Sequence, residues 1–268
     1  MAGFKYLNKL QGKRILVLGG SSGIGFAVAQ AAVEHGAVVY ISSSKQARVD
    51  NAVTRLQTFA KEVGLPSDKI FSKTCDLSNV DTLESNITEL LDFATADGKL
   101  NHVVLTAGDA LNPPPLKDIT LNQLHKSSTV RFYSAIFLAK LLPKYVVSDS
   151  SSSLTLSSGS KTKRPDPNWS IITAQGGALE GAVRGFAMDL RPIRVNLIEL
   201  GIVETEFLEH IPEQVRGQLL ATHAKANLLG KVGTPEDVAE AYLYCLKDSF
   251  VTGTTIVTDG GMLVGGSE

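Results

Sequence analysis

The feature that most constrains the fold is a regular alternation of short apolar runs with longer amphipathic segments along the chain. The apolar runs have the length of buried strands, and the amphipathic segments have the period of helices. Strands that alternate with helices are typical of parallel β-α-β units. The sequence therefore predicts a single α/β domain over residues 1–268, with a doubly wound parallel sheet of about seven strands and helices on both faces.

The predicted elements follow the whole chain without a break. The predicted strands are 14–18, 37–41, 70–75, 102–105, 153–156, 194–198 and 254–257. The predicted helices are 25–35, 51–63, 82–94, 121–142, 174–190 and 235–246. We expect Pro143 to close the helix 121–142 and Thr234 to cap the last helix. No linker rich in proline and glycine divides the chain, so we expect no second domain.

A glycine-rich turn stands between the first strand and the first helix, with the sequence Leu18-Gly19-Gly20-Ser21-Ser22-Gly23-Ile24-Gly25. Glycine permits a tight turn and lets backbone N–H groups at a helix N-terminus approach a pyrophosphate. Because the turn lies early and between strand and helix, it predicts a Rossmann-like dinucleotide site. The alternative is a purely structural turn between the two elements.

The end of the second strand indicates which dinucleotide is bound. Ser43, Ser44 and Lys45 follow this strand, and Arg48 comes one helical turn later. An NAD site usually has a carboxylate here for the ribose 2′-OH. Hydroxyl and cationic groups suit a 2′-phosphate instead, so we expect NADPH and NADP⁺. The alternative is that Lys45 and Arg48 only begin a solvated helix.

Further motifs follow the later strands. They are Asp76-Leu77, Thr106-Ala107-Gly108, Leu200-Gly201-Ile202-Val203-Glu204-Thr205, Gly233-Thr234-Pro235-Glu236-Asp237-Val238-Ala239 and Val257-Thr258-Asp259-Gly260-Gly261. With the glycine turn, they resemble the short-chain dehydrogenase/reductase family from end to end. The resemblance implies a set of cofactor contacts at Gly19, Ser21, Ser22, Ile24, Asp76 and Gly108. It also implies that Ile202 and Thr205 hold the nicotinamide amide.

The chain departs from this family at the catalytic positions. The family uses an Asn, a Ser, and a Tyr with a Lys four residues later, so that Tyr and Lys share one helix face. Aligning the segment Gly177-Ala178-Leu179-Glu180-Gly181 with the family's helix puts Ile172 at the Tyr and Gly176 at the Lys. Val130 stands at the Asn, and Ser158, or alternatively Ser157, remains from the Ser position. No tyrosine in the chain has a lysine four residues later.

The missing pair restricts the chemistry. Reduction of a ketone creates an alkoxide and needs a proton donor, which Tyr and Lys supply in the family. Hydride addition to an iminium cation gives a neutral amine directly and needs no donor. An intact cofactor site without Tyr and Lys therefore favours a cationic C=N substrate, with a carboxylate nearby to stabilise its charge.

Candidate residues for such a site lie before and within the helix 174–190. Asp166 stands between Pro165 and Pro167, which stiffen its backbone, and Trp169 offers a flat aromatic surface. Gly176-Gly177 would leave room beside the nicotinamide. Arg131 is a candidate partner of Asp166 or of an anionic substrate group.

Each of these residues also has a structural interpretation. Asp166 and Trp169 could form an ordinary turn and its packing, and Arg131 a structural ion pair. Gly176-Gly177 could serve a helix contact, and Ser158 could end its strand. The run Asn112-Pro113-Pro114-Pro115 predicts a rigid loop at the rim of the site.

The combination of absent Tyr and Lys with Asp166, Arg131 and Trp169 resembles a fungal branch of the family. This branch contains the bifunctional reductase/Diels–Alderases of the malbrancheamide and paraherquamide indole alkaloid pathways. The resemblance implies NADPH reduction of a zwitterionic iminium of a prenylated cyclic dipeptide, followed by intramolecular [4+2] cycloaddition to a bicyclo[2.2.2]diazaoctane. It makes Asp166 the counterion and proton-handling group, Arg131 its organiser and Trp169 part of the pocket wall.

The segment 204–230 has an apolar side formed by Phe207, Leu208, Ile211, Leu219, Leu220, Leu228 and Leu229. We expect it to be a lid over a hydrophobic substrate; the alternative is an insertion packed on the core. Two other functions stay open. A chain that keeps a nucleotide site without proton donors could be a regulator that binds NADP(H), and improvised acids could make it an atypical carbonyl reductase.

Composition excludes several other classes. A formal net charge of −1 gives no electrostatic basis for nucleic-acid binding. Two cysteines make no disulfide framework, and no apolar run has the length of a signal peptide or a membrane span, so we expect a reduced cytoplasmic protein. The five histidines have no metal-ligand spacing, so we expect no metal site. The resemblance also implies a homo-oligomer, a dimer or a tetramer, that pairs through the helices 121–142 and 174–190.

Overall fold

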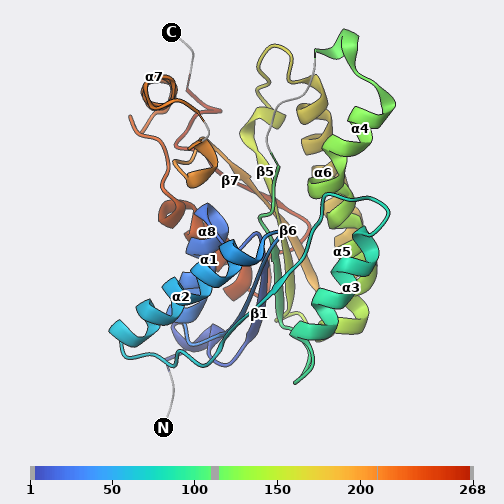
Figure 1. The fold of residues 1–268 in the computed structure, drawn as a ribbon, viewed down its shortest axis with the longest axis vertical. Helices are drawn as coiled ribbons and strands as arrows, with labels where there is room; N and C mark the ends of the chain where they lie inside the picture. Colours follow the sequence, from blue (N-terminus) through green and yellow to red (C-terminus); the bar gives the residue numbers. More distant parts are fainter. Residues whose placement is uncertain (1–3, 110–114, 210, 266–268) are drawn as a thin grey trace.

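The protein folds around one seven-stranded parallel sheet with the strand order β3-β2-β1-β4-β5-β6-β7, as a computed structural model shows (Figure 1). The structure describes residues 4–109, 115–209 and 211–265. The strands are β1 Arg14–Leu18, β2 Val38–Ser43, β3 Ile70–Thr74, β4 His102–Leu105, β5 Ser153–Gly159, β6 Arg194–Leu200 and β7 Thr255–Thr258. The predicted Rossmann-like α/β fold is therefore confirmed.

Helices cover both faces of the sheet, as predicted (Figure 1). They are α1 Gly23–Glu34, α2 Gln46–Glu62, α3 Leu83–Ala94, α4 Leu121–Ser128, α5 Ser134–Tyr145, α6 Ser170–Asp189, α7 Glu213–Ala226 and α8 Pro235–Lys247. Two separate apolar clusters form the core. One lies between the sheet and α1, α2 and α8, and the other between the sheet and α3, α5 and α6. The apolar runs are buried on both sides because the sheet is covered on both faces.

The long helix predicted over 121–142 is wrong in two respects. A π-helical turn, Thr129–Tyr133, separates α4 from α5. Pro143 lies inside α5, which continues to Tyr145. A π-helical turn widens the helix locally and is frequent at functional sites. Here it contains both Val130 and Arg131, so the departure from regular helix falls on two positions that the sequence singles out.

Other element boundaries moved by a few residues. β5 and β6 continue to Gly159 and Leu200, so their ends carry the residues after the predicted strands. Helix α6 begins at Ser170 and includes Ile172 in its first turn. The cap predicted at Thr234 is confirmed, because its hydroxyl accepts from Asp237 N–H and the Asp237 carboxylate accepts from Thr234 N–H.

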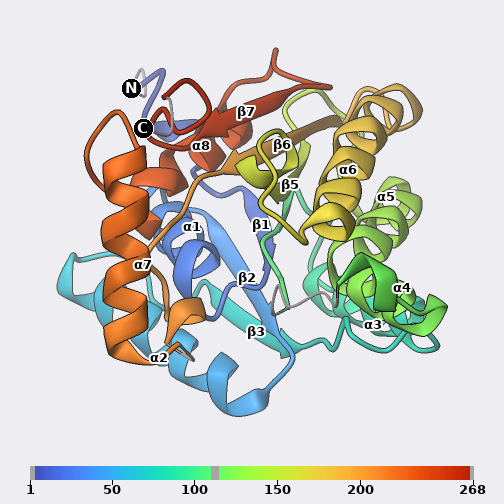
Figure 2. The same ribbon diagram turned by 90° about the horizontal axis from the view of Figure 1, so that it is seen from above.

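The order of the strands sets the position of the site. From β1 the chain builds outward to β2 and β3, and then returns to place β4 on the other side of β1. Ligands of such sheets bind beyond the carboxyl ends of the strands, where the order reverses. Figure 2 looks onto this end of the sheet, with α7 on one side and α4 and α6 on the other.

Candidate functional site

The glycine turn after β1 is built by close backbone packing. A Cβ on Gly19, which has φ +90°, would lie 2.5 Å from the Ala107 nitrogen, and a Cβ on Gly25 would lie 2.2 Å from the Gly19 carbonyl oxygen. Both positions therefore require glycine. The Ser22 side chain makes no capping hydrogen bond at the N-terminus of α1. The turn thus leaves polar groups of the loop and of the first helical turn available for a phosphate.

One N–H group of this turn already has an anionic partner. Gly23 N–H donates to Glu206 Oε2 at 2.8 Å, and the other carboxylate oxygen lies 3.9 Å from Arg55 Nη1. Glu206 stands at the start of the segment 204–230, directly after Thr205, whose side chain packs against Gly23. A carboxylate is stabilised at a helix N-terminus by the same N–H groups and dipole that favour phosphate.

A hollow of about 240 Å³ lies at the carboxyl ends of β2 and β3. Its lining residues are Ser44, Thr74, Cys75, Asp76, Asn86 and Glu89. Asp76 shapes its own loop, because its carboxylate accepts from the N–H and the hydroxyl of Ser78 at 2.9 and 2.7 Å. Lys45 is exposed directly after Ser44. The hollow and its neighbours therefore fit the adenosine end of a dinucleotide.

The predicted cofactor residues lie where strands and the following loops meet at this edge. They are Gly19, Ser21, Ser22, Ile24, Ser43, Ser44, Lys45, Asp76, Gly108, Ile202 and Thr205. The glycine notches and the adjacent hollow fit a bound dinucleotide, so these residues would hold NADPH. The contacts of the individual residues stay predictions.

The two residues that we align with the family's Tyr and Lys have no ionisable group. Ile172 and Gly176 lie one turn apart on α6. The prediction that Gly176 opens space beside the nicotinamide is wrong, because a Cβ there would lie 1.9 Å from Thr162 Oγ1. Thr162, from the loop between β5 and α6, therefore fills the notch, that is, the space that a Cβ of residue 176 would occupy. Gly177 faces open space instead.

Asp166 begins a tight turn. Trp169 N–H donates to the Asp166 carbonyl at 3.1 Å, Pro167 follows Asp166, and Asn168 has φ +68°. Proline at the second position and a left-handed residue at the third are typical of a type II turn, where Asn is accepted in place of Gly. The Asp166 carboxylate accepts from Lys161 Nζ at 2.7 Å. The turn and the lysine together fix the direction of this carboxylate.

Arg131 lies on the π-helical turn and contacts Asp109, not Asp166; its other predicted role, as partner of an anionic substrate group, stays a prediction. Its Nη2 donates to the Asp109 carbonyl at 2.7 Å, and its Nε lies 3.3 Å from Asp109 Oδ1. Its guanidinium packs on Gly108, where a Cβ would lie 2.5 Å from Nη2. Burial lowers the pKa of Arg131, and the Asp109 carboxylate opposes this shift. Arg131 therefore lies beside the loop after β4, and the described contacts do not pair it with Asp166.

A second ion-pair cluster lies next to the site. Lys163 Nζ lies 2.6 Å from Glu199 Oε2 and 3.4 Å from Glu180 Oε1. The Glu199 side chain is fully buried, and burial raises its pKa while Lys163 lowers it. Ser158, which pairs with Glu199 in the sheet register, has its hydroxyl 3.3 Å from Thr162 Oγ1. Loss of Lys163, whose side chain is 42% exposed, would leave the buried Glu199 carboxylate without its cation, so this contact holds the loop against β6.

The segment 204–230 forms a short turn, Glu206–Leu208, and the helix α7. None of the described residues of α7 is buried. Phe207, Leu228 and Leu229 are exposed apolar side chains of the segment. Leu208, Leu219 and Leu220 are partly buried. The lid and its alternative, an insertion packed on the core, therefore both stay predictions.

Several absences concern the described residues only. In that part of the chain, no helix is long and apolar enough to cross a membrane. Nor do these residues bring together three His, Cys, Asp or Glu side chains that could hold a metal ion. Cys75 and Cys245 are buried free thiols, and burial raises the pKa of each to about 12. Both are therefore poor nucleophiles. Residues 112–114 of the predicted rim loop lie outside the described part.

Comparison with known proteins agrees with this geometry. The family model described as an SDR-like Rossmann domain matches residues 6–264. The chain belongs to the short-chain dehydrogenase/reductase family. It is 43% identical to the short-chain dehydrogenase/reductase malC of Malbranchea aurantiaca, over 95% of this chain and 96% of that protein. It is 39% identical to fsr5 of Gibberella fujikuroi, over 97% and 98% of the two chains.

Solved structures of the family match as well. The structure of the MalC reductase/Diels–Alderase from Malbranchea aurantiaca has a TM-score of 0.91 and 42% identity, covering 97% of this chain and 100% of that one. A small-chain dehydrogenase in complex with NADPH has a TM-score of 0.76 and 26% identity, covering 95% and 100%. The chain is therefore an oxidoreductase of this family, and its resemblance to the reductase/Diels–Alderase branch is confirmed.

Sequence reasoning missed four residues next to the site: Asp109, Lys161, Thr162 and Glu206. Lys161 had a signal, since the run Lys161-Thr162-Lys163 directly precedes the proline-flanked Asp166. Glu206 had a weaker one in its position after Thr205. Asp109 had no signal, because its relevance depends on which distant elements pack together.

Proposed function

We propose that this oxidoreductase reduces a cationic or zwitterionic cyclic C=N group of a prenylated indole diketopiperazine with NADPH. The same pocket then guides an intramolecular [4+2] cycloaddition to a bicyclo[2.2.2]diazaoctane. The observation that supports the reduction is that the site beside α6 has a carboxylate but no Tyr–Lys proton donor. Ile172 and the Gly176–Thr162 contact replace a proton donor, and a carboxylate held in place by a turn lies in the same loop.

The cofactor in this proposal is NADPH, and it supplies the hydride. The serines after β2 and the exposed Lys45 suit a 2′-phosphate, and the similar NADPH complex supports the choice. The protein's own part is to orient the substrate and stabilise its charge. The Asp166 carboxylate would lie beside the C=N⁺ group and lower the free energy of the bound cation. Since the amine product is neutral, hydride transfer requires no acid from this site.

The flat indole would pack on Trp169, which the Asp166 turn places at the start of α6. The segment 204–230 would close over the substrate from the opposite side, and its exposed apolar residues suit a prenylated ligand. Holding diene and dienophile together raises their effective concentration without any catalytic acid. Support for the cycloaddition comes from the similarity to the MalC reductase/Diels–Alderase.

The proposal is tested by single-turnover oxidation of bound NADPH with two matched sets of compounds, cyclic iminium ions and the corresponding ketones. We expect oxidation with the iminium ions alone. Asp166→Asn should slow it at least about tenfold, because a charge-assisted contact is lost. Asp149→Asn, an exposed substitution in the loop before β5, is the matched control and should leave the rate unchanged. Turnover of ketones would instead identify an atypical carbonyl reductase.

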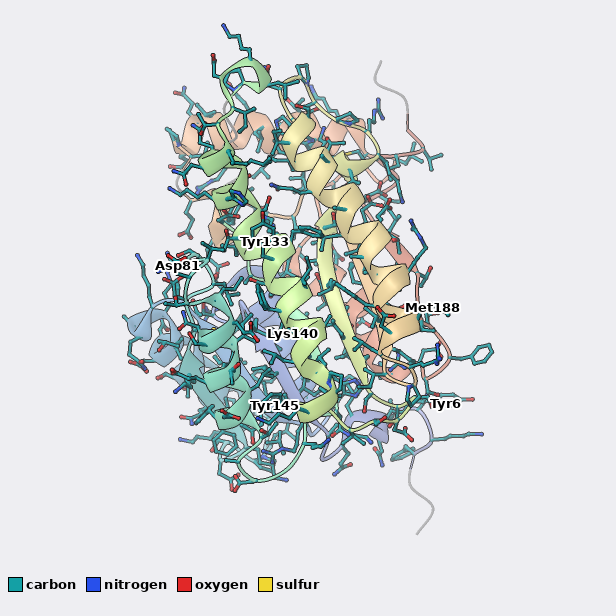
Figure 3. All side chains as sticks on the ribbon, turned by 90° about the vertical axis from the view of Figure 1, so that its right-hand side faces the viewer. Tyr6, Asp81, Tyr133, Lys140, Tyr145 and Met188 are labelled. Atoms are coloured by element: carbon teal, nitrogen blue, oxygen red, sulfur yellow. The ribbon has the colours of Figure 1, made fainter. Side chains whose placement is uncertain are left out.

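The predicted assembly and location remain part of this proposal. We expect a homo-oligomer that pairs through α5 and α6, whose outer faces are turned toward the viewer in Figure 3. Ile136 and Met188 are exposed apolar residues on these helices. Light scattering after size exclusion tests the assembly, and a monomer would contradict it. A cytoplasmic location and the absence of a nucleic-acid partner stay predictions.

A further inference from the structure

The closest polar partner of Asp166 in the described structure is a shielded lysine. Lys161 Nζ lies 2.7 Å from Asp166 Oδ1, and the lysine side chain is only 16% exposed. Its backbone is also fixed, because the Thr173 hydroxyl donates to the Lys161 carbonyl at 3.2 Å. A shielded ammonium keeps more of its electrostatic influence than an exposed one, since less water screens it.

The other cations of this loop are engaged elsewhere. Lys163 pairs with Glu199 and Glu180. Arg164 Nη1 donates to the carbonyls of Met262 and Gly265 at 2.9 and 2.7 Å. Of the three, Lys161 is thus the one whose charge is directed to Asp166 in the described contacts.

The charges of this pair also influence His223 in the segment 204–230. Burial lowers the pKa of His223 on α7, Lys161 lowers it further, and Asp166 raises it. The pair therefore acts electrostatically on α7, although α7 is separated from the β5–α6 loop by about 50 residues of sequence. The proposed function places the substrate between this loop and the segment 204–230.

Because Lys161 is paired with Asp166, it has opposite effects on the binding of two kinds of substrate. A simple cation that approaches Asp166 also approaches the Lys161 ammonium, which repels it. A zwitterion can place its cationic group at the carboxylate and its anionic group at the ammonium, so both interactions are favourable. The pair is thus complementary to a substrate that carries both charges on neighbouring groups.

We propose that Lys161 is a specificity-determining residue that binds the anionic oxygen of the substrate whose iminium group is bound by Asp166, and so selects zwitterions over simple cations. This inference rests on the proposed iminium reduction, because it concerns the same carboxylate. It assigns to Lys161 a function that is independent of proton transfer.

The test compares two cyclic iminium ions of one ring system. One carries an ionised oxygen next to the C=N⁺ group, and in the other this oxygen is methylated. We expect the wild type to have the higher kcat/KM for the zwitterion. Lys161→Met should lower that value about tenfold and raise kcat/KM for the methylated cation. Lys161→Arg keeps the positive charge and should keep the order of preference.

The matched control is Lys9→Met. Lys9 precedes β1, at the amino ends of the strands and away from the site, and its exposed Nζ donates to the Lys247 carbonyl at 3.0 Å. This variant should leave both kcat/KM values unchanged. A purely structural role of Lys161 would lower both values together in Lys161→Met, and that result would overturn the inference.

A binding measurement separates this inference from the proposed function. Trp169 is the single tryptophan of the chain, so its fluorescence reports binding of each compound in the presence of NADP⁺, without turnover. If the wild type reduces neither compound, the proposed reduction is wrong. Tighter binding of the zwitterion that disappears in Lys161→Met would still support the role of Lys161, and equal binding in both proteins would refute it.

Discussion

Two glycine notches in this molecule have different neighbours. In the turn after β1, the space of a missing Cβ is taken by backbone atoms, those of Ala107 at Gly19 and of Gly19 at Gly25. In α6, the space at Gly176 is taken by the side chain of Thr162. Backbone packing fixes the first notch for any chain with this fold, whereas one substitution can empty or fill the second. The chain keeps the pattern of its family at the first notch and departs from it at the second.

The largest expected effect is at the backbone-filled notch. Gly19→Ala should lower the free energy of unfolding by about 3 kcal/mol, because a Cβ meets backbone at φ +90°. NADPH affinity should fall with it. Gly12→Ala is the matched control, since Gly12 has φ +69° and no atom within 4 Å of its Cβ position; it should cost about 1 kcal/mol. Urea denaturation measures both, and equal losses would remove the distinction.

The adenosine end of the proposed cofactor site allows a test of its specificity for the 2′-phosphate of NADPH. Lys45→Ala should raise the Kd for NADPH about tenfold, since one phosphate contact of a charged group is lost. The Kd for NADH should stay the same, because it has no such phosphate. Titration calorimetry with the two cofactors gives both constants. A parallel rise of both would show that Lys45 does not contact the 2′-phosphate.

The side-chain-filled notch should respond in opposite directions at neighbouring residues. Gly176→Ala should destabilise the protein by about 1 kcal/mol, because the overlap with Thr162 outweighs the gain in helix propensity. Gly177→Ala faces open space and should stabilise it by up to about 1 kcal/mol. Thermal unfolding of the two variants measures both stability changes. Stabilisation by both would mean that Thr162 turns away without cost.

Restoring the family's pair is a sharper form of this test. Ile172→Tyr combined with Gly176→Lys should not create ketone reduction, because Thr162 occupies the position of the lysine stem. Adding Thr162→Gly should be required before any ketone turnover appears. Ketone reduction by the double variant alone would show that the notch does not govern the chemistry.

The smallest effect concerns the turn that directs Asp166. Asn168→Gly should change stability by less than about 0.5 kcal/mol, since both residues tolerate φ +68°. Asn168→Ala should cost about 1 kcal/mol and lower kcat/KM for iminium reduction, because the turn opens. Melting temperature and kinetics are measured together. If Asn168→Ala destabilises the protein but leaves its kinetics unchanged, the turn does not contribute to catalysis.

The predictable features are those set by local sequence. Periodicity predicted all seven strands, and the glycine turn predicted the tight backbone packing after β1, where we propose that the phosphates bind. The sequence also predicted that Ile172 and Gly176 stand at the positions of the family's Tyr and Lys. The π-helical turn at Arg131 was not, since its extra residue is accommodated by packing and not by any local signal.

The partners of the site residues were the least predictable. Arg131 was expected to pair with Asp166 or with an anionic substrate group, and its partner within the protein is Asp109, while Asp166 pairs with Lys161. Each alternative is an equally reasonable charge pair in sequence, and only the relative position of loops distinguishes them. The contact between Gly23 and Glu206 joins residues 183 positions apart, so no periodicity could reveal it.

That last contact has a consequence for the order of events in a catalytic cycle. The Glu206 carboxylate accepts from an N–H in the first turn of α1, at the end of the helix where the fold places a pyrophosphate. A pyrophosphate bound to this N–H would displace the carboxylate, and Glu206 belongs to the segment 204–230 that we propose as the substrate lid. Cofactor would thus prepare that segment before substrate arrives, which gives an ordered kinetic scheme with cofactor first.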